Sequence, residues 1–179
     1  MVEYKCGCYE MKKILLILLL FLCVGCEKNK DVNQFKKEYE SYNSSYLKLN
    51  ISDKNVFQYR SVSDVNQLIS EGTCVIYIGS PQDNLSRKVV EILLDASSNT
   101  DLKTIYYLDT LEGVHLDMVS DKNIPIVLFV VDGKVEKYMV GTIDGKVDLS
   151  DDEVITLYNQ YLEGIHLVLQ DSCNEECQE

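Results

Sequence analysis

The chain has 179 residues, of which 46% are hydrophobic and 26% charged, as expected for one compact domain with a short appendage. Its 29 acidic and 17 basic residues give a formal net charge of −12. This charge repels nucleic-acid phosphates and anionic lipid surfaces, so we expect no nucleic-acid partner. Two prolines and nine glycines argue against a fibrous or disordered chain.

An apolar run near the N-terminus predicts an export signal. Residues 14–25 (ILLILLLFLCVG) carry no charge and follow Lys12 and Lys13, as the apolar region of a secretory signal follows its basic region. A bilayer takes about 20 apolar residues, so a short transmembrane anchor is the less favoured alternative. We predict a signal peptide over residues 1–25. Translation could begin at Met11, because the ten residues before it include two acids and two cysteines.

The end of the apolar run resembles the lipobox of bacterial lipoproteins. It reads Leu22-Cys23-Val24-Gly25-Cys26, with a small residue before a cysteine. In that family the cysteine takes a diacylglyceryl thioether and becomes the mature N-terminus. The resemblance implies that Cys26 is lipidated and anchors the chain on the extracytoplasmic face of the cell membrane. Cys23 departs from the usual leucine, although cysteine is also a small hydrophobe.

Residues 26–50 follow as a polar segment with one apolar stripe. Val32, Phe35, Tyr39, Tyr42 and Tyr46 recur at spacings of three and four, which predicts an amphipathic helix. The helix could be a spacer from the membrane, could bind a partner, or could pack on the domain. Packing is favoured, because an uncovered aromatic stripe is costly.

The body, over residues 51–179, alternates strand and helix patterns. We expect a strand at 56–59, a helix at 63–70 with Ser63 as its N-cap, a buried strand at 73–78, a helix at 84–96 and a strand at 104–108. The second strand, the second helix and the third strand form a βαβ unit, whose crossover favours parallel pairing.

The second half of the body predicts a hairpin and a terminal helix. Residues 126–131 and 134–140 read as strands, and Asp132-Gly133 between them suits a type I′ turn. Ser150 and Glu153 have the spacing of a capping box that begins the last helix. The sequence therefore predicts an α/β domain with a central mixed sheet flanked by helices.

An ordered set of motifs resembles the small thioredoxin-like proteins exported by low-GC Gram-positive bacteria. The matching segments are GTCVIYIGSP at 72–81, Arg87, Tyr106 to Asp109, Ile124-Pro125, Asp132-Gly133-Lys134, Gly141-Thr142 and the pair Cys173 and Cys177. The resemblance covers about residues 35–177. It implies a thioredoxin-like fold, with Pro125 as the cis-proline beside the active-site helix.

The active-site motif of that family, C-P-W-C, is replaced here. Its two redox cysteines fall at Asp83 and Ser86. Neither a carboxylate nor an unactivated hydroxyl can attack a disulfide, so dithiol exchange at this position is excluded. We predict that Asp83 caps the following helix. The alternative is a polar contact for a ligand or metal; a hydrolase triad is disfavoured, because neither His115 nor His166 is placed beside Ser86.

Three cysteines remain in the body. Cys74 lies in an apolar strand and is predicted to be a buried, inert thiol. Cys173 and Cys177 are four residues apart, which on a helix brings their Cα atoms into the disulfide range, and a disulfide is our first interpretation. A zinc site with His166 is the alternative, although Asp171-Ser172 is expected to interrupt the helix. We predict no cofactor and no metal.

Two functional hypotheses follow. The first is a membrane-anchored binding module that takes an exported peptide or protein in a groove around Asp83, Leu85 and Pro125, with no catalysis. The second is a thiol–disulfide redox protein that uses Cys173 and Cys177, or an accessory partner of a sister protein that carries C-P-W-C. A short loop between two cysteines favours a reducible bond, which keeps the second hypothesis open.

Overall fold

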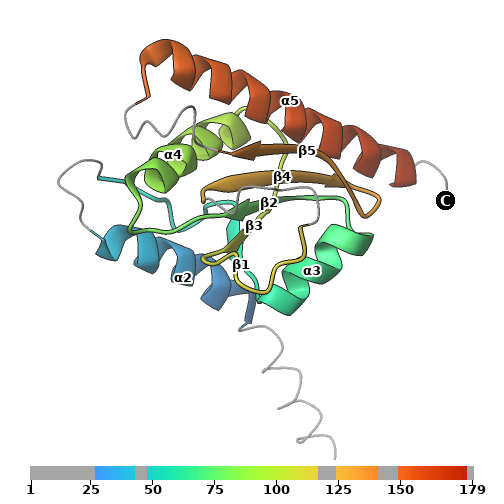
Figure 1. Ribbon diagram of the computed structural model, residues 1–179, viewed down its shortest axis with the longest axis horizontal. Helices are drawn as coiled ribbons and strands as arrows, with labels where there is room; N and C mark the ends of the chain where they lie inside the picture. The colour runs from blue at the N-terminus through green and yellow to red at the C-terminus, as the bar shows by residue number, and fades with distance from the viewer. Residues whose placement is uncertain (1–26, 43–47, 117–123, 141–148, 177–179) are drawn as a thin grey trace, which may run out of the picture.

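The structure is a computed structural model that describes residues 27–42, 48–116, 124–140 and 149–176 (Figure 1). The predicted signal peptide, the lipidation residue Cys26, the segment Gly141-Thr142 and Cys177 lie outside the described residues. Within the described part of the chain, no helix is long and apolar enough to cross a membrane.

A five-stranded mixed sheet forms the centre of the domain. Its strands are β1 (Phe57–Tyr59), β2 (Cys74–Ile78), β3 (Ile105–Leu108), β4 (Ile126–Val131) and β5 (Lys134–Val140). Their order is β1-β3-β2-β4-β5, with β1, β3 and β2 parallel and β4 antiparallel to both β2 and β5. Every residue of β2 is buried, as its continuous apolar run predicts. The predicted central mixed sheet is confirmed.

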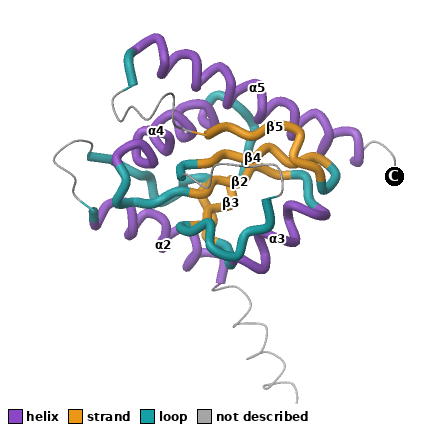
Figure 2. The backbone as a smooth tube through the Cα atoms, in the orientation of Figure 1, coloured by secondary structure: helices purple, strands orange, loops and turns teal. Residues whose placement is uncertain are grey.

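Helices cover both faces of the sheet (Figure 2). They are α2 (Glu27–Ser41), α3 (Val62–Glu71), α4 (Asn84–Ser98) and α5 (Asp151–Glu176). Because side chains alternate along a strand, Val75 and Tyr77 of β2 join the core that also holds α2, α4 and α5. Cys74, Ile76 and Ile78 join the smaller core under α3.

The aromatic stripe of α2 is part of the main core. Phe35 and Tyr39 are completely buried, and the ring of Phe35 stacks on that of Phe57 in β1, with centroids 4.2 Å apart. The sequence allowed a spacer, a partner-binding helix or a helix packed on the domain. Phe35 and Tyr39 pack on the domain. Tyr42, just beyond the helix, is 43% exposed.

The N-cap prediction for α3 is wrong by two residues. The cap is Ser61, whose hydroxyl accepts from the amide of Asp64, while the Asp64 carboxylate accepts from the amide of Ser61 (both 3.2 Å). This reciprocal pair requires a carboxylate three residues after the serine. Ser63 has no such partner at that spacing, because residue 66 is an asparagine.

The last helix begins as predicted and continues further than expected. The amide of Ser150 donates to the carboxylate of Glu153 (2.7 Å), which is the expected capping pair. The helix runs through Asp171 and Ser172 because both polar side chains have partners. Ser172 donates to the carbonyl of Val168 (3.0 Å), and Asp171 accepts from Thr73 (3.1 Å).

Candidate functional site

The positions that the resemblance assigns to redox cysteines lie at the start of α4. Asp83 is the N-cap of this helix, in agreement with the sequence prediction. One of its carboxylate oxygens accepts two hydrogen bonds from Ser86, one from the backbone amide and one from the hydroxyl, each 2.7 Å long. A short hydrogen bond therefore joins the two side chains that a disulfide would join in a thioredoxin.

Ser86 is completely buried, and its hydroxyl forms two hydrogen bonds within the protein. It donates its only proton to Asp83 and accepts from the amide of Ser80 (3.2 Å). His115 and His166 are both exposed, and neither is a hydrogen-bond partner of Ser86. A nucleophilic serine needs an adjacent base and access to substrate, so this geometry suits a structural cap rather than catalysis.

Two buried tyrosine hydroxyls, from Tyr39 and Tyr77, form a hydrogen-bonded chain that reaches the first turn of α4. Tyr77 donates to the backbone oxygen of Ser86 (3.0 Å), and the hydroxyls of Tyr39 and Tyr77 are 2.9 Å apart. Since each hydroxyl has one proton, Tyr39 is the donor in this pair. Burial raises the pKa of both tyrosines well above the ordinary value, so both stay neutral.

Arg87 is a buried side chain that links two parts of the fold, a role that the sequence patterns did not predict. It is 1% exposed, and its guanidinium donates to the backbone oxygens of Tyr39 (2.7 Å) and Pro81 (3.2 Å). Desolvation lowers its pKa, but arginine remains protonated in proteins. Its match to the last residue of the family motif was the only signal in the sequence. In this structure Arg87 joins α2 to the loop that leads into α4.

The cis-proline lies next to this loop. The Ile124–Pro125 peptide bond is cis, the isomer that the resemblance implies. The sheet register pairs Ile78 of β2 with Ile126 of β4, so the residues just beyond, Gly79 and Pro125, meet at the same edge of the sheet. The loop that begins at Gly79 and the Ile124-Pro125 segment are therefore neighbours in the structure, as the resemblance implies.

The expected peptide groove is less open than the sequence suggested. Leu85 is only 4% exposed and Pro125 is buried. Asp83 and Ile124 are half-buried, and Gln82 is exposed, with its side-chain amide donating to the hydroxyl of Tyr42 (2.7 Å). Leu85 is buried on the same side of α4 as Val89, which follows one turn later. Gln82, Asp83 and Ile124 thus contribute exposed surface at this edge, whereas Leu85 and Pro125 do not.

Cys74 does not provide a reactive thiol. Cys74 is free and 7% exposed, and burial raises the pKa of its thiol to about 12, so the predicted inert thiol is confirmed. Cys173 lies on α5, and its predicted partner Cys177 is outside the described residues. Among the described residues, no group of three His, Cys, Asp or Glu side chains could hold a metal ion.

Comparisons of the chain with protein-family models, with curated proteins and with solved structures find no significant match. The start of α4 is therefore interpreted from its own geometry: a capped helix, a buried serine that hydrogen-bonds to the cap, and a buried arginine.

Proposed function

We propose that this chain is a membrane-anchored, extracytoplasmic thioredoxin-like protein that has lost dithiol chemistry and acts as a peptide- or protein-binding module. The observation that carries the proposal is the pair of 2.7 Å hydrogen bonds from Ser86 to Asp83. They occupy the helix N-terminus that would stabilise a thiolate in a redox-active relative.

The strand order and the cis bond support the thioredoxin-like part of the proposal. A βαβ unit, a cis-proline, a hairpin and a terminal helix follow one another as the resemblance implies. The cis bond at Pro125 lies beside the loop into α4, through the register of β2 and β4. These features agree with a thioredoxin-like site that has no dithiol at residues 83 and 86, and they support the proposal.

Peptide binding does not require the two thiols, because it depends on hydrogen bonds between the protein backbone and the main chain of the peptide. In thioredoxin-like proteins the residue before the cis-proline hydrogen-bonds the main chain of an extended substrate, and Ile124 holds that position here. An extended peptide would lie across Ile124, Asp83 and Gln82, which all have exposed surface at this edge. Main-chain hydrogen bonding gives affinity with little sequence selectivity.

Amide chemical shifts test the binding proposal directly. The purified chain is titrated with a pool of short unstructured peptides of varied sequence. We expect shift changes concentrated at Gln82, Asp83 and Ile124, with none at Gln67, an exposed residue of α3. Changes of equal size at Gln67, or no saturable change at Ile124, would contradict the proposal.

The anchor is tested at Cys26. Replacing it with alanine should leave an unprocessed precursor of larger apparent mass and should remove the acyl chains from the membrane-bound form. Cys23→Ala is the matched control, because it removes the neighbouring cysteine and keeps the acceptor. If Cys26→Ala left size and acylation unchanged, the lipoprotein assignment would fail while the binding proposal would stand.

A further inference from the structure

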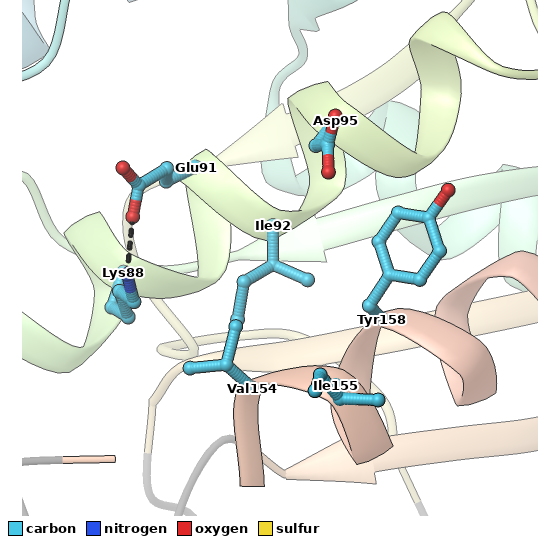
Figure 3. A pocket seen from close by; sticks show the side chains of 7 residues that line it. All are labelled: Lys88, Glu91, Ile92, Asp95, Val154, Ile155 and Tyr158. Carbon is cyan, nitrogen blue, oxygen red and sulfur yellow. Dashed lines mark hydrogen bonds and ion pairs between the residues drawn. The ribbon is translucent and has the colours of Figure 1, made fainter. Parts of the chain in front are cut away.

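A groove of about 540 Å³ lies between α4 and α5, away from the cis-proline edge (Figure 3). Its lining residues are Lys88, Glu91, Ile92 and Asp95 from α4, and Val154, Ile155 and Tyr158 from α5. Figure 3 shows Lys88 opposite Val154 at one end and Asp95 beside Tyr158 at the other. The two helices thus run in the same direction along the groove, which is lined by about two turns of α4 and about one turn of α5.

The floor of the groove is apolar and partly uncovered. Ile92 is buried at the base, and Val154 and Tyr158 are half-buried against it. Ile155 is 57% exposed, the most exposed large hydrophobic side chain among the described residues. An isoleucine at a solvated helix position gives no stability to the isolated domain, but it supplies apolar area to a bound segment.

The rim of the groove is negatively charged. Lys88 is neutralised by Glu91, with the ammonium and carboxylate 2.5 Å apart. Asp95 is exposed, and its carboxylate forms no ion pair with any described residue. Asp151 lies one turn before Ile155 on the same face of α5 and is also exposed. Among the lining residues, Lys88 and Glu91 neutralise each other and Asp95 supplies a carboxylate that is unpaired within the described part of the chain; Asp151, one turn before Ile155, adds a second negative charge next to the groove.

We propose that this groove is a docking site for an amphipathic, basic helical segment of a partner protein. Such a segment would place apolar side chains on Ile92, Ile155 and Tyr158, in the helix-in-groove mode, with lysines or arginines beside Asp95 and Asp151. The volume is within the range that accepts several large side chains.

The negative charge of the groove disfavours two other ligands, a second copy of this chain and an anionic lipid surface. A second copy of this chain would bring a body of net charge −12 to an acidic rim, and anionic lipid headgroups would meet the same repulsion. The site is also separate from the cis-proline edge of the proposed function, because it involves none of Gln82, Asp83 or Ile124. Failure of one proposal leaves the other standing.

The test uses the full chain, purified in detergent, and a fluorescent synthetic helix with leucines on one face and lysines on the other. A matched probe carries glutamates in place of the lysines. Ile155→Asp is compared with Leu167→Asp, a 40% exposed leucine of α5 outside the groove. Asp95→Lys is compared with Asp101→Lys, an aspartate outside the groove whose side chain is 98% exposed. Fluorescence anisotropy gives each dissociation constant, and sedimentation reports the oligomeric state.

We expect saturable binding of the lysine probe and none of the glutamate probe. Ile155→Asp and Asp95→Lys should each weaken binding about tenfold or more, the equivalent of about 1.4 kcal/mol, while both control variants bind as the wild type does. Equal weakening by the controls would mean general attraction to an acidic protein and would overturn the proposal. So would the absence of binding, or a dimer that Ile155→Asp dissociates.

Discussion

The guanidinium of Arg87 donates a 2.7 Å hydrogen bond to the backbone oxygen of Tyr39, 48 residues earlier in the chain. A second bond reaches the backbone oxygen of Pro81, in the loop before α4. Because Arg87 is 1% exposed, water cannot replace either bond. One buried cation therefore fixes the end of α2 against the segment that presents Asp83.

Replacing Arg87 with methionine should destabilise the protein strongly. Methionine keeps much of the apolar stem but leaves two buried carbonyl oxygens without their donor, at a cost of about 2–4 kcal/mol in the free energy of unfolding. Urea denaturation measures this cost, and hydrogen exchange should show faster opening of α2 than of β2. Lys103→Met, at a side chain 85% exposed, should change stability by no more than about 0.5 kcal/mol. Equal effects of the two substitutions would contradict the role of Arg87.

Replacing Asp83 with alanine should also lower stability. The substitution removes the helix cap and leaves the buried hydroxyl of Ser86 without its acceptor, so we expect a loss near the upper end of about 0.5–2 kcal/mol. Asp83→Asn should cost less, because the amide keeps an oxygen acceptor and loses only the charge–dipole interaction of about 0.3–1 kcal/mol. A more stable Asp83→Ala protein would argue that Asp83 is held in place for a ligand instead.

High pH should unfold the domain through its buried tyrosines. Burial raises the pKa of Tyr39, Tyr77, Tyr107 and Tyr161 in the folded state, whereas the unfolded side chains titrate near pH 10. Above that pH the folded state holds more protons than the unfolded state, so stability falls as the pH rises, and it is unaffected below. Each buried tyrosine contributes up to about 1.4 kcal/mol per pH unit.

Absorbance of the tyrosinate ion checks this prediction. The four buried tyrosines should ionise only together with loss of the folded circular-dichroism signal. Ionisation of all twelve tyrosines in a protein that stays folded would show that the tyrosine core is not closed to water.

Cys74 should resist alkylation until the protein unfolds. Its pKa of about 12 leaves almost no thiolate at neutral pH, and its burial blocks the reagent. Iodoacetamide labelling followed by peptide mapping should find the Cys74 peptide unmodified in the native protein and modified in denaturant. Rapid native labelling of that peptide would contradict the burial of β2.

Much of the fold follows from local patterns in the sequence. The run from Cys74 to Ile78 predicts a buried strand, and Asp132-Gly133 predicts the turn, where both residues have positive φ. Local patterns do not predict structure that depends on a contact with a residue far away in the sequence. The helix passes through Asp171 because Thr73, 98 residues earlier, donates to its carboxylate, and no spacing rule contains that contact.

The candidate site shows the same division. The capping role of Asp83 is local and was predicted, since the carboxylate and the amide of Ser86 are three residues apart. The two carbonyls that Arg87 binds belong to Tyr39 in α2 and to Pro81 in the loop before α4, so these bonds depend on how α2 packs against that loop. These tertiary contacts could not be read from the residues of one helix.

We propose that the start of α4 serves structure and binding and performs no disulfide exchange. The decisive measurement is the rate of insulin reduction with dithiothreitol, for the wild-type chain and for a double variant, Asp83→Cys with Ser86→Cys. We expect the wild-type rate to equal that of dithiothreitol alone and the double variant to be faster, because its thiols would lie at a helix N-terminus. Acceleration by the wild-type chain that is lost in Cys173→Ser would overturn the proposal, because the terminal cysteines would then carry a redox activity.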